Sequence, residues 1–205
     1  MKAGNMKLLR PLNQVLNGID AFFERMARLS GWAALALVVI IVYDVITRRF
    51  GLPRLFGVNA TQLQETEYWL HTLLFAFAIA HTYRIDGHVR IDIFRKEFSL
   101  RKKLWIEVFG NLFFLIPVSV IALKFHVDYA LRAYHEGATS NSTLGLGNVW
   151  ILKSVLCLMF LTLGVAGIAA LIRALLALRG SSNTSDNDTA SKSERASAHQ
   201  RRGKN

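Results

Sequence analysis

The sequence predicts an all-α integral membrane protein with four transmembrane helices, an N-terminal amphipathic interfacial helix and a disordered C-terminal tail. Of its 205 residues, 52% are hydrophobic, and they gather in four long stretches that lack strand-like alternation. The chain also carries a net charge of +11, an excess that a soluble hydrophobic core does not explain. The single Cys157 excludes a disulfide framework, and the presence of only three prolines excludes a collagen-like chain.

The N-terminal segment, residues 1–28, is expected to form the amphipathic helix. Apolar residues recur every three or four positions, with charged residues between them. They are Leu8, Leu12, Val15, Ile19, Phe22, Met26 and, just beyond the segment, Leu29. Such a helix can lie in the headgroup layer with its apolar side toward the lipid, and Pro11 is tolerable if it falls in the first turn. A helix packed on a soluble partner is the alternative.

The transmembrane domain is predicted at residues 29–179, with spans at about 29–47, 65–83, 105–126 and 149–172. Each is near or above the length that crosses roughly 30 Å of hydrocarbon at 1.5 Å per residue. A cleaved signal peptide is disfavoured for the first span because no small-residue cleavage pattern follows it; Asp44 and Arg48 come there instead.

Proline and small residues mark the later spans. In the third span, Gly110, Asn111 and Pro117 predict a packed and kinked helix, since proline removes a backbone hydrogen bond. In the fourth, Gly164 and Gly167 allow neighbouring helices to approach closely. Residues 180–205 contain almost no large apolar side chain, so they are expected to form the disordered tail.

The basic residues predict the orientation of the chain. Five precede the first span, seven lie between the second and third, and seven follow the fourth, whereas the first loop has three and the third loop one. The positive-inside rule therefore places both termini and the middle loop in the cytoplasm. Because the excess follows this topology and no zinc-finger or RNA-binding signature accompanies it, a nucleic-acid partner is not expected.

No motif for ATP hydrolysis, dinucleotide binding or the common hydrolase mechanisms occurs in the chain. We therefore expect no enzyme activity and no catalytic, cofactor-binding or metal site. The remaining candidates are ionisable groups near the membrane ends, because burying a charge in lipid is costly.

Asp44 is predicted near the outer end of the first span, one helical turn before Arg48 and Arg49. An ion pair between Asp44 and Arg48, four residues apart, would neutralise the carboxylate near the interface. A contact with a partner subunit or a coupling ion is the functional alternative.

Glu65 and Glu67 stand at the start of the second span, in the segment LQETEYW. The helix dipole favours carboxylates at this end of a helix, so local stabilisation explains them. Docking of a periplasmic partner is the other interpretation. Acids two residues apart lie on different sides of a helix, so a shared catalytic dyad is disfavoured.

The segment after the second span, HTYRIDGHVRIDIF, gathers His88, Arg90 and Asp92 at the predicted cytoplasmic interface. Their alternation with apolar residues suggests a short interfacial segment that anchors the turn between two spans. A metal site is disfavoured there because other usual ligands are missing.

Two histidines allow a second function to be considered. With four antiparallel spans, His71 and His126 both fall toward the outer side, and they could bracket a b-type haem. The alternative to a transport function is therefore a haem-binding membrane anchor of a redox complex.

Read in order, YDVITRRF, LQETEYWLH, DGHVRIDIF and GNLFFLIP resemble one family: the small membrane (DctQ-type) subunit of the TRAP, or tripartite ATP-independent periplasmic, transporters. The resemblance covers roughly residues 12–178. Glu65 and Glu67 match an acidic pair of one branch of that family, Arg48 its span-one arginine, and His88, Arg90 and Asp92 its motif after span two. The sequence departs at Ala78, where glycine is usual, and in STLGLGNVW, where a Gly-Gly-Leu-Pro type turn is common.

The resemblance implies a multi-pass subunit of the bacterial inner membrane that takes part in ion-driven, usually sodium-driven, uptake of an organic anion. It implies two protein partners: a periplasmic substrate-binding protein, and a large membrane subunit that carries the substrate and ion sites. The small subunit would bind and brace the large one.

Overall fold

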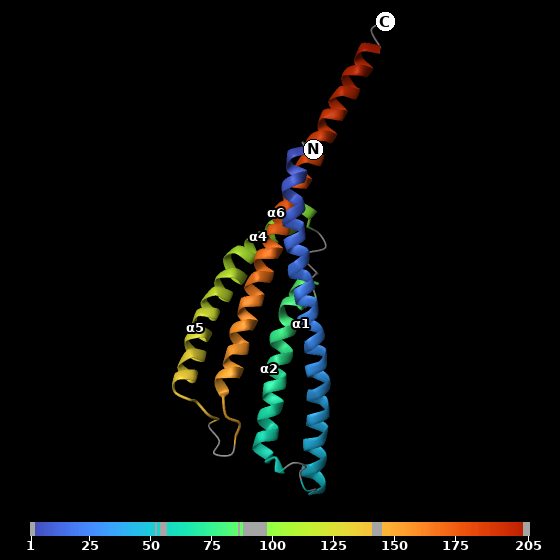
Figure 1. Ribbon diagram of the computed structural model, residues 1–205. Helices are drawn as coiled ribbons and strands as arrows, with labels where there is room; N and C mark the ends of the chain where they lie inside the picture. Colours follow the sequence, from blue (N-terminus) through green and yellow to red (C-terminus); the bar gives the residue numbers. More distant parts are fainter. Residues whose placement is uncertain are drawn as a thin grey trace. The chain divides into compact units, whose positions relative to one another are not determined.

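The structure is a computed structural model that describes residues 3–51, 53, 57–85, 87, 98–140 and 145–202, with side chains described between Arg10 and Arg179. In this part of the chain all regular secondary structure is helical (Figure 1). The elements are α1 (Ala3–Phe50), α2 (Ala60–Arg84), α4 (Leu100–Gly110), the π-helical η2 (Asn111–Leu115), α5 (Ile116–His135) and α6 (Val149–Arg202). They form two compact units, Met1–Val89 with Ile116–Ala166, and Arg90–Leu115 with Gly167–Asn205.

α1 joins the predicted interfacial arm and the predicted first span in one helix of 48 residues. The predicted arm is therefore continuous with the predicted first span, because no proline interrupts the helix near their junction at residue 28. Pro11 lies inside the helix and not in its first turn, because α1 already begins at Ala3. The helix ends at Gly51, whose φ of 63° is the left-handed conformation typical of a residue after a helix.

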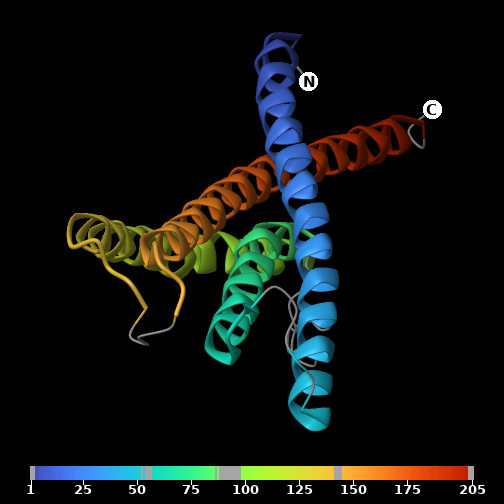
Figure 2. The same ribbon diagram turned by 60° about the horizontal axis from the view of Figure 1, so that its bottom comes forward.

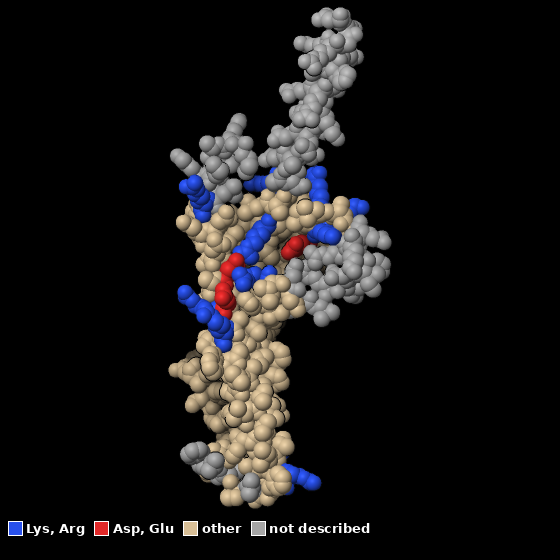
Figure 3. All heavy atoms as spheres, turned by 90° about the vertical axis from the view of Figure 1, so that its right-hand side faces the viewer, with Lys and Arg blue, Asp and Glu red and all other residues tan. Residues whose placement is uncertain are grey.

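Buried residues recur along α1 every seven positions: Leu16, Phe23, Ser30, Leu37 and Asp44. A seven-residue repeat keeps one narrow stripe of a helix facing its neighbour. Of the apolar residues predicted for the arm, Val15, Phe22 and Leu29 are 60%, 49% and 56% exposed, so their contact with lipid stays a prediction. Between Arg28 and Asp44 α1 has no charged residue, and Figure 3 shows a correspondingly long uncharged surface.

α1 and α2 form an antiparallel hairpin (Figures 1 and 2). The Ser30 hydroxyl donates to the Leu74 carbonyl at 2.9 Å, and Asp20 pairs with Arg84 at 3.5 Å. Ten residues along α1 thus correspond to ten residues back along α2, which fixes the register of the hairpin. Near the Asp20 end, Phe23 packs with Ala80 and Ala166 in a small buried core.

α2 begins with a capping box, in which the Gln62 side chain accepts a hydrogen bond from the backbone N–H of Asn59 at 3.2 Å. It is 25 residues long and contains the whole predicted second span. Three described helices are long and apolar enough to cross a membrane: Arg10–Phe50, Leu100–His135 and Val149–Arg179. α2 is not among them because Glu65, Glu67, His71 and His81 make it more polar. Candidate membrane-spanning helices are therefore present at three of the four predicted places.

The third predicted span lies within a continuous run of helix from Leu100 to His135. This run contains the π-helical segment η2, which ends two residues before Pro117. The Asn111 side chain donates to the Glu107 carbonyl at 2.9 Å. Proline cannot donate a backbone hydrogen bond, so the ladder is interrupted at this point, and a π turn is one way to accommodate the interruption. The irregularity predicted from Gly110, Asn111 and Pro117 is present as this π turn.

In the first unit, α5 and the beginning of α6 lie side by side and antiparallel (Figure 1). The contacts move backward along α6 as they advance along α5. They join Ser119 to Gly164, His126 to Phe160, Tyr129 to Lys153, and Tyr134 to Trp150. A Cβ on Gly164 would lie 3.4 Å from the Ser119 Cβ, so Gly164 permits the close approach that its small size predicted.

α6 continues to Arg202, where the sequence predicts a disordered tail. The backbone of residues 180–202 is helical, so that prediction differs from the structure. No proline interrupts this stretch, and alanine, lysine, arginine, glutamate and glutamine supply good helix formers. Adding residues to an existing helix is easier than starting a new one.

Candidate functional site

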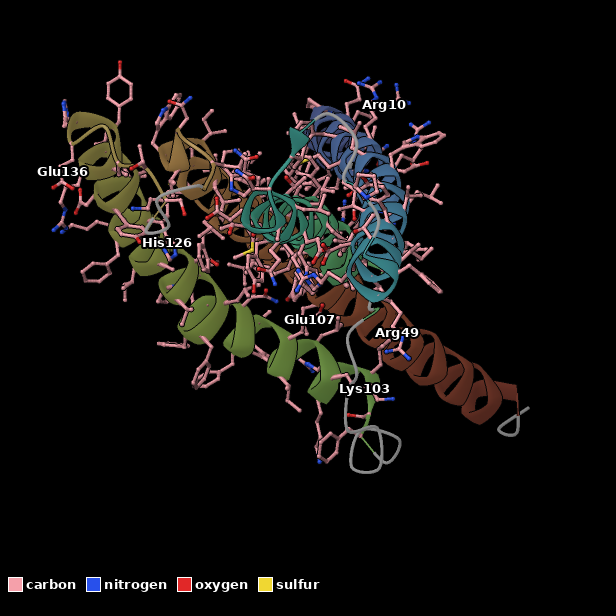
Figure 4. The ribbon with its side chains drawn as sticks, turned by 90° about the horizontal axis from the view of Figure 1, so that it is seen from below. Arg10, Arg49, Lys103, Glu107, His126 and Glu136 are labelled. Carbon is pink, nitrogen blue, oxygen red and sulfur yellow. The ribbon has the colours of Figure 1, made fainter. Side chains whose placement is uncertain are left out.

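The first polar site is at the C-terminal end of α1, where Asp44 is 5% exposed and its carboxylate lies 2.6 Å from the Arg48 guanidinium. The ion pair predicted from their spacing is present. Thr47 donates its hydroxyl to the Asp44 carbonyl at 3.0 Å, which holds the same turn. Arg49 is exposed and points outward from the end of α1 (Figure 4). The cation next to a buried carboxylate lowers the cost of keeping that charge at a membrane interface.

The second polar site joins α2 to the loop between α5 and α6. Ser140 donates its hydroxyl to one carboxylate oxygen of Glu65, and the backbone N–H of Leu146 donates to the other. The loop also closes on itself, since the Ser140 N–H donates to the Leu146 carbonyl at 3.2 Å. Glu65 thus fastens a loop that is 75 to 81 residues away in the sequence. This cluster of Glu65, Ser140, Gly145 and Leu146 is called the loop clamp below.

Gly145 is required by the geometry of the loop clamp. A Cβ at this position would overlap the Glu65 carboxylate and the Ser140 side chain. Glu65 could swing away only by giving up its hydrogen bonds, and the Ser140 Cβ is fixed to the backbone. By contrast, a Cβ on Gly147 would meet no atom within 4 Å. The STLGLG segment, which departs from the turn common in the resembling family, therefore uses its first glycine for contact with α2.

Glu67 lies on a different side of α2 from Glu65, as the two-residue spacing predicts. It takes no part in the loop clamp. One of its carboxylate oxygens is buried and has no hydrogen-bond partner among the residues that the structure describes. Glu65 therefore has an internal structural role that Glu67 does not share.

The third polar site, Asp20 with Arg84, was missed by the sequence reasoning. Their side chains are 22% and 25% exposed and close the end of the α1–α2 hairpin opposite the Asp44 end. The signal that could have found the pair is an acidic residue on the first helix and a basic residue on the second, both far from the loop that connects the helices of the hairpin.

The two histidines considered for a haem do not form such a site in the described structure. The His71 ring is exposed and stacks on Phe75 of its own helix at 5.0 Å. His126 projects from α5, hydrogen-bonds the Ala122 carbonyl at 2.8 Å and contacts Phe160 at 4.7 Å (Figure 4). The haem alternative therefore gains no support. Among the described residues no group of three or more His, Cys, Asp and Glu side chains could hold a metal ion.

His88, Arg90 and Asp92, the remaining predicted site residues, lie outside the described residues. The nearest described part is the end of α2, where the Gly87 N–H donates to the Thr82 carbonyl at 2.9 Å. The interfacial anchoring predicted for this segment stays a prediction.

Comparison with known proteins agrees with this picture of a helical membrane subunit. Residues 37–177, more than half of the chain, match the family described as "Tripartite ATP-independent periplasmic transporters, DctQ component". The matched region includes Asp44, Arg48 and the loop clamp, and it begins inside α1. No curated protein and no solved structure matches the chain significantly. The chain therefore belongs to the DctQ family, the small membrane component of the TRAP transporters.

Proposed function

We propose that this protein is the small permease subunit that braces the large membrane subunit of a TRAP transporter. The transporter would take up an organic anion delivered by a periplasmic binding protein, driven by an ion gradient, sodium being the usual one in such systems. The observation that carries this proposal is the family match over residues 37–177.

The α1–α2 hairpin supports a bracing role because its two helices are fastened to each other and α2 is fastened to a third part of the chain. Asp20 and Arg84 hold one end, Ser30 and Leu74 the middle, and the loop clamp ties the N-terminal part of α2 to another loop. α1 has 48 residues. At 1.5 Å per residue that is about 72 Å, more than twice the hydrocarbon thickness of a bilayer. A long helix held in this way resists movement relative to the membrane.

We place the subunit in the bacterial inner membrane with four spans and both termini in the cytoplasm. The distribution of basic residues supports this orientation. The antiparallel register of the hairpin supports α2 as the additional span, because α2 runs beside the uncharged part of α1. The N-terminal part of α1 would then lie at or beyond the cytoplasmic headgroup layer.

The substrate and ion sites belong, in this proposal, to the large membrane subunit. Asp44, Glu65 and Asp20 each have a partner within the helices and loops of this chain. The chain therefore has no enzymatic step of its own, and its partners are the large subunit, the periplasmic binding protein and membrane lipid.

Affinity purification of the tagged chain from its native membranes in mild detergent tests this proposal. We expect a large multi-span membrane protein to be recovered with it in a fixed ratio. Recovery of a haem protein or of a soluble enzyme in place of a multi-span partner would contradict the proposal. The absorption spectrum of the same sample checks for haem directly.

A further inference from the structure

The exposed residues of α2 form one stripe. Between Ala60 and Arg84 the exposed residues are Gln64, Tyr68, His71 and Phe75. Their spacings of four, three and four residues place all of them on the same side of the helix. Three of the four carry a hydrogen-bonding group, and Tyr68 is 66% exposed. These four residues are called the α2 stripe.

The α2 stripe lies beside the part of α1 that has no charged residue. Ser30 contacts Leu74, and Asp20 contacts Arg84, so the register runs one residue forward on α1 for each residue backward on α2. Residues 64–75 of α2 thus lie opposite residues of about 29–40 in α1, at 1.5 Å of rise per residue in both helices. That part of α1 belongs to a helix apolar enough to cross a membrane. The α2 stripe is therefore at the depth of the hydrocarbon.

The exposed faces of two other helices have a different character. Every exposed residue of α1 from Leu29 to Ile46 is apolar, including Leu35, Val39 and Val42. In the first unit the exposed residues of α6 are Ile151 and Leu161, which are also apolar. Apolar faces are suited to lipid, whereas a face with Gln64, Tyr68 and His71 leaves hydrogen-bonding groups in a medium without water.

Gln64, Tyr68 and His71 are exposed, and each carries a hydrogen-bonding group that is costly to leave without a partner at membrane depth. Lipid tails offer no hydrogen bonds, whereas a transmembrane helix can present polar side chains. The α2 stripe therefore calls for a protein neighbour with polar groups.

We infer that the α2 stripe is the surface on which a helix of the large membrane subunit docks, and that this helix offers hydrogen-bond partners to Gln64, Tyr68 and His71. This inference rests on the proposed function, since that function supplies the partner. It divides the membrane surface of the chain into a partner-facing α2 and lipid-facing parts of α1 and α6.

Site-specific photocrosslinking in the assembled complex tests the inference. The crosslinker benzoylphenylalanine replaces Tyr68, which is 66% exposed, or, as the matched control, Phe125 of α5, which is an equally exposed 65%. We expect the large subunit to be captured from position 68 and not from position 125. Capture from position 125 alone would overturn the inference while leaving the proposed function intact. Capture of a second copy of this chain from position 68 would also overturn it, and failure to recover any large subunit would reject the proposed function as well.

Leucine substitutions separate docking from folding. His71→Leu and Gln64→Leu each remove an interhelical hydrogen bond in the inferred complex, which should weaken association with the large subunit about 3- to 15-fold. The isolated chain should melt at an unchanged or higher temperature, since the substitutions remove polar groups from lipid. Phe125→Leu is the control and should leave association unchanged. Unchanged association for both His71→Leu and Gln64→Leu would overturn the inference, as would a parallel loss of thermal stability in the isolated chain.

Discussion

The loop clamp makes a prediction that can be worked through from its contacts. Replacing Glu65 with glutamine keeps the size of the side chain but removes the negative charge and turns one of its two acceptors into a donor. That donor would face either the Ser140 hydroxyl or the Leu146 N–H. Hydrogen bonds to charged groups contribute about 1.5–3 kcal/mol each, and neutral ones about 1 kcal/mol. Because the site is only partly buried, we expect Glu65→Gln to cost about 2 kcal/mol of local stability.

Hydrogen–deuterium exchange of the loop measures this cost. At 1.4 kcal/mol for each factor of ten, 2 kcal/mol corresponds to about 30-fold faster exchange of the Leu146 amide through local opening. Gly145→Ala should accelerate exchange at least as much, because the added methyl group displaces both Glu65 and Ser140. Gly147→Ala is the matched control, since its Cβ meets open space.

The reasoning would be refuted if the Leu146 amide exchanged in Glu65→Gln at the rate of the Gly147→Ala control. Equal effects of Gly145→Ala and Gly147→Ala would refute the role assigned to Gly145. A double-mutant cycle between Glu65→Gln and Ser140→Ala adds an independent check, because two side chains that bond to each other should give non-additive changes.

Two further predictions concern helix packing. Arg48→Gln removes the partner of the buried Asp44 and should lower the free energy of unfolding by about 2 kcal/mol. The loss is smaller than for a fully buried pair because Arg48 is half exposed. The control Arg49→Gln should have little effect, and equal shifts of the melting temperature for the two variants would contradict this. Gly164→Leu should lower the free energy of unfolding by about 1–3 kcal/mol, because the larger side chain forces α5 and α6 apart. The control Gly31→Leu faces open space and should be tolerated. A Gly164→Leu protein that melts like the wild type would show that the two helices do not pack closely there.

The features predicted well from the sequence are those that depend on local periodicity. Long apolar runs gave membrane-length helices, and the four-residue spacing of Asp44 and Arg48 gave their ion pair. The boundary predicted near residue 28 follows a change in composition, from amphipathic to apolar, while the backbone hydrogen bonds continue unbroken there. Composition reports the surroundings of a helix and not where it ends.

The features that escaped prediction depend on contacts between distant residues. The role of Glu65 is decided by a loop that follows it by 75 residues or more, so neither its neighbours nor the helix dipole indicate it. The same holds for Asp20 and Arg84, which meet only once the hairpin has formed. The polar stripe of α2 is present in the sequence as a periodic pattern, but only the packed hairpin shows that it faces outward.

The central claim is that this chain is a non-transporting brace within a TRAP transporter, and uptake into proteoliposomes tests it most directly. The vesicles carry this chain alone, the large subunit alone or both, with the binding protein and its radiolabelled organic anion outside and a sodium gradient across the membrane. The account predicts uptake only when both subunits and the binding protein are present. Uptake by vesicles that contain this chain alone would contradict it.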